Sequence, residues 1–222
     1  MTDGTDASTP RARSPRMARD ERRAQVLRIA QELFSSEGFH HVSMDDIAER
    51  AEVSKPVLYR HFPSKLDLYL AVVDQNGADL LVAVDTAVSG IEQGPVRRGD
   101  GRDVIAAIVE AYIMFVEGAG ESSALLFESD VTHDADVRAR VEHASSEAAR
   151  RISVVLSQVT ALPLDDAAML AVSLNAMAQG AATYRLRQPS DAGPERTVEL
   201  VTQLAWGGVS ALIRPDFEYE DA

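Results

Sequence analysis

Apolar side chains recur every three or four residues in nine separate stretches of this chain, which is the spacing of one face of an α-helix. The strict alternation of apolar and polar residues that marks a half-buried β-strand is nowhere convincing. The pattern therefore predicts an all-α protein of about nine helices. They are expected at residues 20–37, 43–51, 54–62, 64–90, 103–117, 122–129, 134–160, 165–186 and 195–213.

Glycine and proline separate these stretches. Gly38 is placed to end the first helix, because glycine accepts the left-handed conformation without strain. Residues 93–102, QGPVRRGDGR, are the clearest loop, and residues 189–194 form another. Pro163 and Pro215 stop the helices that precede them.

The second and third predicted helices are short and close together, within residues 43–65, SMDDIAERAEVSKPVLYRHFPSK. Ser43 and Asp46 have the spacing of a capping box at the start of the first of them. Ser54 is placed to cap the second, and Pro56 is tolerated in its first turn. Two short helices joined by a tight turn form a helix-turn-helix, whose second helix enters the DNA major groove.

Polar side chains cover the expected outer side of this motif. A plain buried helical hairpin would not need them, so we expect them to contact DNA. Lys55 is expected to reach base edges, while Tyr59, His61 and Lys65 are expected to hold phosphates. The predicted DNA-binding residues are Ser43, Ser54, Lys55, Pro56, Tyr59, His61 and Lys65.

The charge distribution agrees with DNA binding although the net charge is −13. Residues 1–65 hold 11 Lys/Arg against 10 Asp/Glu, whereas residues 66–222 hold 11 against 25. The acidic body would repel DNA, so the motif alone would approach it. Residues 1–19 are predicted to be a disordered basic arm that is either solvated or in contact with DNA. Residues 216–222 are an acidic tail.

Several classes of protein and site are disfavoured. The chain has no cysteine, and its N-terminus has no apolar segment typical of a signal peptide. The uncharged run from Ala167 to Tyr184 favours a buried helix over a membrane span. We expect a cytoplasmic protein that does not bind membranes. His40 and His41 lack a third metal ligand at useful spacing, and phosphate-loop and nucleophile motifs are missing, so we expect no metal site, no cofactor and no enzymatic activity.

The motif and its flanks resemble the TetR family of transcription regulators over roughly residues 21–70. This resemblance implies a helix-turn-helix domain at residues 20–65 and a ligand-binding and dimerisation domain at residues 66–215. It also implies a homodimer on a palindromic double-stranded DNA operator. Family members usually have glycine where this chain has Glu52. The resemblance is carried by Phe34, Gly38, Phe39, Ile47, Ala48, Ala51, Val53, Ser54, Leu58, Tyr59, His61, Phe62, Lys65 and Leu66.

Two further sites are expected in the body. A small apolar effector would bind among the middle helices, although most of these side chains would also suit an ordinary core. The ligand-binding candidates are Ile108, Tyr112, Phe115, Leu126, Phe127, Met169, Leu174 and Met177. Small residues and a tryptophan in the last two helices favour close packing, either with a second subunit or within the chain. The dimer-interface candidates are Ala171, Asn175, Ala178, Ala182, Trp206 and Gly208.

A narrower resemblance, carried by residues 20–23, 54–72, 126–130 and 205–208, is to the actinobacterial TetR-type regulators of fatty-acid synthase genes. It implies that long-chain acyl-CoA is the effector and that lipid or fatty-acid biosynthesis genes are regulated. Alternatively, the chain represses an efflux pump and is released by a lipophilic cation near Glu110, Glu117 and Glu128. Six arginines are expected either to form a basic mouth, meaning a positively charged opening to the site for coenzyme A, or to lie on a solvated helix face. They are Arg138, Arg140, Arg150, Arg151, Arg185 and Arg187.

Overall fold

The computed structural model describes residues 19–89, 100–127, 134–188 and 192–212. The predictions for the arm at residues 1–18, for Glu128 and for the tail at residues 216–222 lie outside these ranges.

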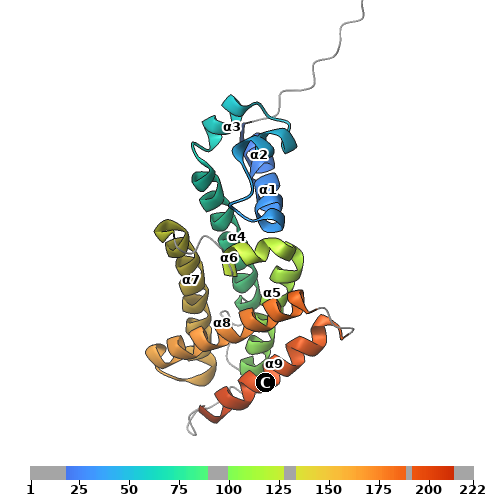
Figure 1. The fold of residues 1–222 in the computed structure, drawn as a ribbon. Coiled ribbons are helices and arrows are strands. Elements are labelled where there is room, and N and C mark those ends of the chain that lie inside the picture. Colours follow the sequence, from blue (N-terminus) through green and yellow to red (C-terminus); the bar gives the residue numbers. More distant parts are fainter. Residues whose placement is uncertain (1–18, 90–99, 128–133, 189–191, 213–222) are drawn as a thin grey trace, which may run out of the picture.

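The described residues form nine α-helices and two short 3-10 helices, and no strand occurs among them, which confirms the all-α prediction. Figure 1 shows α1, α2 and α3 at one end, a long α4 leading away from them, and a body made of the remaining helices. The elements are α1 (Arg19–Glu37), α2 (Met44–Arg50), α3 (Lys55–His61), α4 (Lys65–Val88), α5 (Asp100–Ala119), η1 (Gly120–Ser123), α6 (Ala124–Phe127), α7 (Ala135–Thr160), α8 (Leu164–Arg187), α9 (Pro194–Val209) and η2 (Ser210–Leu212).

The helices α1, α2 and α3, called the head below, share a small core. Phe34, Ile47 and Leu58 are fully buried, one from each helix. Three rings join the head to the start of α4: Tyr69 of α4 lies 5.2 Å from Phe34 and 5.0 Å from Phe39, measured between ring centroids, in edge-to-face contacts. The start of α4 therefore packs against α1 and the loop that follows it.

α4 is continuous and packs along α7. Gly77 lies in this contact, where a Cβ atom added to it would be 3.1 Å from the Cβ of Ala144, so this glycine permits close packing of the two helices. Ion pairs close the edges of the contact: Arg140 with Asp74, and Arg151 with Asp85 at 2.5 Å. α4 thus connects the body to the head as one continuous helix.

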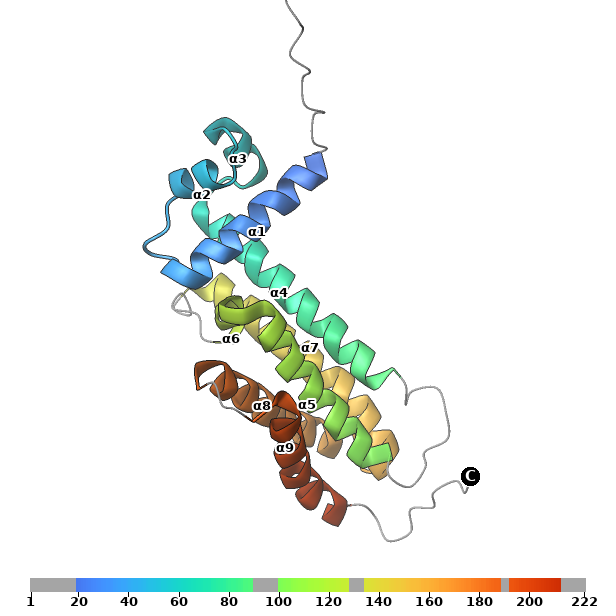
Figure 2. The ribbon, with the colours of Figure 1, turned by 90° about the vertical axis from the view of Figure 1, so that its right-hand side faces the viewer.

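α5 begins at Asp100, so the predicted loop at residues 93–102 was too long. Gly101 lies inside the first turn because the indole of Trp206 occupies the space beside it; an added Cβ atom would come within 2.7 Å of that ring. The glycine reflects a tertiary contact with α9 rather than a loop. Figure 2 shows α8 and α9 together along one side of the body, away from α4.

Among the described residues, no helix taken singly is long and apolar enough to cross a membrane. Helices α7 and α8, bent by 120° relative to each other, satisfy the length and composition criteria only as a pair.

Candidate DNA-binding face and effector pocket

The start of α2 and the turn between α2 and α3 have the geometry that the sequence predicts. The Ser43 hydroxyl accepts a hydrogen bond from the Asp46 amide, and the Asp46 carboxylate accepts from the Ser43 amide at 2.8 Å, which completes the capping box. The Ser43 hydroxyl also donates to the Asp46 carboxylate at 2.6 Å, and this bond, followed by the one from the Ser43 amide, lowers the pKa of Asp46. Glu52 adopts a φ of 52°, so a side chain occupies the left-handed position where glycine would be unstrained, at a cost of roughly 1–2 kcal/mol.

The outer face of α3 presents the residues expected to read DNA. Lys55 and Tyr59 lie one helical turn apart and both are exposed. Ser43, Ser54 and Pro56 are exposed beside them. Ser54 is the N-cap of α3 by position, but its side chain makes no capping hydrogen bond, so its hydroxyl is available to a phosphate oxygen.

Lys55 is paired within the head, a contact that sequence reasoning missed. Its ammonium donates to the Asp45 carboxylate at 2.8 Å, and this hydrogen bond raises the pKa of Lys55. Both side chains are largely exposed, so water screens the pair and DNA can displace it. Asp45 thus holds the lysine ammonium on the exposed face of the head.

Lys65 has a different position from the other candidates. Its ammonium donates to the carbonyl oxygens of Phe39 and Val42, at 2.8 Å and 2.9 Å, and lies 4.3 Å from the centre of the Phe39 ring. It is half-buried. This lysine joins the loop after α1 to the start of α4, so it positions the head.

His61, at the end of α3, is half-buried, and its Nε2 atom is buried without a hydrogen-bond partner in the described structure. Burial lowers its pKa, and the positive charges of Arg60, Arg19 and Arg23 lower it further, against a smaller opposing effect of Asp20. The imidazole is therefore held neutral among arginines that gather at the N-terminus of α1 and the C-terminus of α3.

We expect the imidazole of His61 to titrate below its ordinary value of 6.5 in the folded protein and near that value in urea. Because the folded pKa is the lower one, protonation favours unfolding, and stability should fall as pH drops from 6.5 toward the folded pKa. Heteronuclear NMR of the imidazole, assigned with His61→Gln, measures the midpoint. A folded midpoint at or above 6.5 would contradict this environment.

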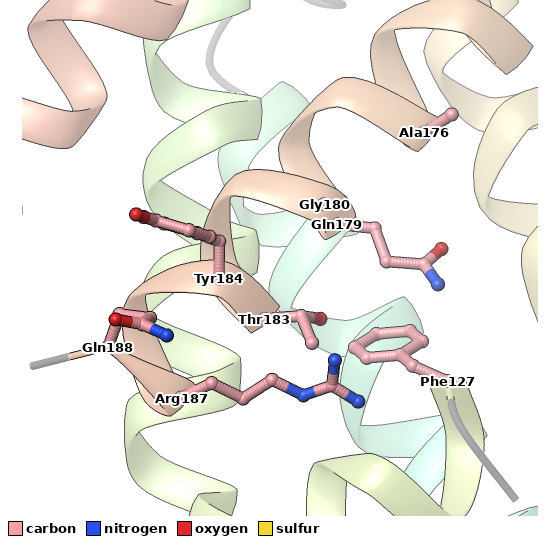
Figure 3. A pocket seen from close by; sticks show the side chains of 8 residues that line it. All are labelled: Phe127, Ala176, Gln179, Gly180, Thr183, Tyr184, Arg187 and Gln188. Carbon is pink, nitrogen blue, oxygen red and sulfur yellow. The ribbon is translucent and has the colours of Figure 1, made fainter.

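A surface pocket of about 450 Å³ lies between the end of α6 and the C-terminal half of α8. In Figure 3 the guanidinium of Arg187 and the amide of Gln179 both extend toward the Phe127 ring. The pocket combines an aromatic wall with amide, hydroxyl and guanidinium groups, which suits a ligand with an apolar and an anionic part. Its lining is Phe127, Ala176, Gln179, Gly180, Thr183, Tyr184, Arg187 and Gln188.

The predicted ligand-binding residues divide into three groups. Ile108, Tyr112, Leu126 and Leu174 are buried in the core behind the pocket. Phe115, Phe127 and Met177 pack against that core and are partly buried, and of all the candidates only Phe127 lines the pocket. Met169 was wrongly placed in the pocket: its side chain is 65% exposed, because it faces outward on α8.

The small-residue stripe of α8 was wrongly predicted as a dimer surface. Ala171, Asn175, Ala178 and Ala182 are buried inside the single chain. The Asn175 side chain accepts a hydrogen bond from the Tyr112 hydroxyl of α5. Small residues allow α8 to pack closely on its own neighbours. Of the two expected uses of this stripe, a second subunit or contact within the chain, the structure shows contact within the chain. The indole of Trp206 likewise packs on Gly101 of its own chain.

The opposite face of α8 and α9 is apolar and exposed, and sequence reasoning missed it. The outward face, as we call it, consists of exposed large hydrophobic residues, of which Tyr184 also lines the pocket: Met169, Val172, Tyr184, Leu200, Leu204 and Leu212. Gly207 and Gly208 belong to the same side, since Cβ atoms added to them would meet nothing within 4 Å. A second stripe at helical spacing was present in the sequence, but it was less uniform in side-chain size than the buried one.

Most of the expected basic mouth is used within the chain. Arg140 and Arg151 pair with aspartates of α4, and Arg150 pairs with Glu147 at 2.6 Å. Arg185 pairs with Glu117 at 2.7 Å. The six arginines therefore do not form one basic opening. Arg187 is the arginine that lines the pocket.

Comparison with known proteins places this architecture among bacterial regulators. The family model for "Bacterial regulatory proteins, tetR family" matches residues 26–72. The HTH-type transcriptional activator FasR of Mycolicibacterium smegmatis is 39% identical over 198 residues, which cover 89% of this chain and 87% of FasR. The HTH-type transcriptional regulator EthR of the same species is 36% identical over 103 residues, 45% of this chain and 48% of EthR.

Two solved structures share the fold. A TetR-like transcriptional regulator from Rhodococcus sp. RHA1 superposes with a TM-score of 0.70 at 27% identity, over 88% of this chain and 99% of that one. The transcriptional regulator FadR from Bacillus subtilis, in complex with stearoyl-CoA, superposes with a TM-score of 0.68 at 12% identity, over 83% of this chain and 98% of that one.

Proposed function

Because this chain belongs to the tetR family of bacterial regulatory proteins, which are transcription regulators and not enzymes, we propose that it is a homodimer that binds a palindromic DNA operator and responds to a long-chain acyl-CoA. Residues 20–65 would form the DNA-binding domain and residues 66–215 the effector and dimerisation domain. Its site of action would be the cytoplasm, where bacterial operators lie.

The exposed face of α3 is the observation that carries DNA recognition. Lys55 would leave Asp45 for a base edge, while Ser43, Ser54 and Tyr59 would hold the backbone. Lys65 would act by holding the loop after α1 in place rather than by binding phosphate directly. His61, with Arg60 exposed beside it, would contribute at the edge of this face.

The effector proposal rests on the pocket and on the relatives. An acyl chain would enter past Phe127, parting the side chains around Tyr112, while the anionic coenzyme A portion would meet Arg187 and the amide of Gln179. FadR, which shares the fold, is described with bound stearoyl-CoA, and FasR is similar over most of the chain. Control of lipid or fatty-acid biosynthesis genes follows as part of the same proposal.

The alternative function, an efflux-pump repressor that a lipophilic cation releases from its operator, is less well supported. Glu117 is engaged by Arg185, and Arg187 gives the pocket a positive charge that a cation would meet.

A pool of random-sequence duplexes selected on the protein would supply the operator and test DNA recognition. We expect Lys55→Ala to lower affinity for the selected duplex by about tenfold and to relax base preference in each half-site, since it removes a base contact. Fluorescence anisotropy measures both effects. Lys65→Ala is the comparison: it should act through head stability, seen by thermal melting. If Lys55→Ala lowers affinity equally for every DNA sequence, the proposed role of Lys55 in base recognition is contradicted.

A further inference from the structure

A chain of hydrogen bonds crosses the joint between the head and the body. Gln31 of α1 donates from Nε2 to the Ser122 hydroxyl of η1 at 2.8 Å. That hydroxyl donates in turn to the Ala119 carbonyl at 2.5 Å, so its lone pairs remain for Gln31. Asn76 of α4 donates from Nδ2 to the Ser122 carbonyl at 3.3 Å. One serine therefore joins three separate elements.

Two of the three residues that make this contact are buried, and the third, Gln31, is half-buried. Asn76 is 1% exposed and Ser122 5%. Because a buried donor or acceptor is costly to leave unpaired, the bonds favour one placement of α1 against η1 rather than a continuous range of placements. Beside them runs an open cleft of about 450 Å³, bounded by Arg28, Glu32 and Ser36 of α1 and by Glu121. The packing between α1 and η1 is therefore incomplete on this side of the joint.

Residues 120–127, called the corner arm below, connect this contact with the pocket. Gly120 has a φ of 56°, a conformation that turns the chain sharply after α5 and that other residues adopt only with strain. The arm then runs through η1, which packs on α1 and α5, into α6, which packs on α4. Its first end thus lies at the head, and its last residue, Phe127, lines the pocket.

Phe127 is placed to report occupancy of the pocket. Its ring stacks on Tyr112, with centroids 6.3 Å apart, and meets Phe115 edge-on at 6.0 Å. A ligand that enters the pocket contacts this ring, and a chain that passes behind it must displace the ring from those two partners. Phe127 is at one end of the corner arm, and Ser122 is near the other end, so displacement of the Phe127 ring would act on the segment that holds Ser122.

We propose that Gln31, Ser122 and Asn76 form a latch that couples occupancy of the pocket to the placement of the DNA-reading head, a role that rests on the proposed function of the pocket as the effector site. These three are positioning residues, since none of them lines the pocket beside Phe127. The corner arm moves with Phe127, the latch bonds shift between α1 and Ser122, and the separation of the two heads in a dimer changes.

A double-mutant cycle on operator affinity tests the latch without any effector. We expect Phe127→Ala to change affinity about threefold or more in the parent protein and to have almost no effect in a Gln31→Leu background, because the link to the head is then cut. Ser122→Ala should act like Gln31→Leu and should not add to it. Gln75→Leu is the matched control, since the Gln75 side chain is exposed on α4 and donates to Asp79 of its own helix.

Stearoyl-CoA, titrated in parallel by calorimetry, separates the latch from the effector proposal. Gln31→Leu should still bind stearoyl-CoA, yet its operator affinity should no longer respond to it. If the parent protein does not bind stearoyl-CoA but the effects of Phe127→Ala and Gln31→Leu on operator affinity are not additive, the acyl-CoA proposal is excluded and the latch is retained. Additive effects in the cycle and an unchanged response of Gln31→Leu to the ligand would overturn the latch, provided that thermal melting shows both variants folded.

Discussion

Leu204→Glu is expected to convert the protein to a monomer and to lower its affinity for the operator by about a hundredfold or more. Leu204 is 69% exposed on the outward face, next in space to the open Gly207 and Gly208. A carboxylate there would be buried without a partner in a dimer seam, which is strongly unfavourable. A monomer has one head and binds only half of a palindromic operator. It therefore loses the gain in affinity from binding two half-sites at once, which is typically a factor of about 10²–10⁴.

Light scattering coupled to size exclusion gives the mass, and anisotropy gives the operator affinity. Val82→Glu is the matched control, because Val82 is 64% exposed on α4, outside the outward face. Gly208→Arg offers a second test, since its side chain would extend into open space within one chain. Ala178→Arg, by contrast, would place a charge in the core and unfold the protein. If Leu204→Glu and Gly208→Arg both remain dimers, the interface lies elsewhere.

Affinity for acyl-CoA is expected to rise about tenfold for every two carbons added to the chain, until the space behind Phe127 is filled. Burying each methylene contributes about 0.8 kcal/mol, so two contribute slightly more than one factor of ten. Titration calorimetry with saturated acyl-CoAs below their micellar concentrations measures the series. Operator affinity measured with each ligand should shift by about 1–3 kcal/mol, the usual range of such coupling.

Arg187→Glu should lower affinity by a similar factor at every chain length, because it opposes the anionic part that all members of the series share. Arg138→Glu, on the exposed side of α7, is the control and should leave the series unchanged. A flat response in which no acyl-CoA binds would exclude this effector and leave a DNA-binding regulator whose effector is of another class.

Local rules account for what could be predicted about the head. Ser43 and Asp46 form their capping box from residues three apart, and Glu52 takes the strained turn that its place between two helices requires. Lys65 shows the limit of such rules. Its position on the sequence suggested a phosphate contact, but two carbonyl groups from the loop after α1 hold its ammonium. Those partners are 23 and 26 residues away, and no local pattern indicates them.

The helices and the helix-turn-helix could be predicted from local sequence, because helical periodicity depends on residues within a few positions of one another. Only the tertiary structure decided which face of α8 is buried. Small residues such as Ala178 allow close approach to any neighbouring helix, so the stripe predicts tight packing without naming the partner. In the fold this stripe packs inward, and the Asn175 side chain within it accepts a hydrogen bond from Tyr112 of α5. Met169 was thereby left on the outward face, and the pocket was left beside Phe127 at the end of the corner arm.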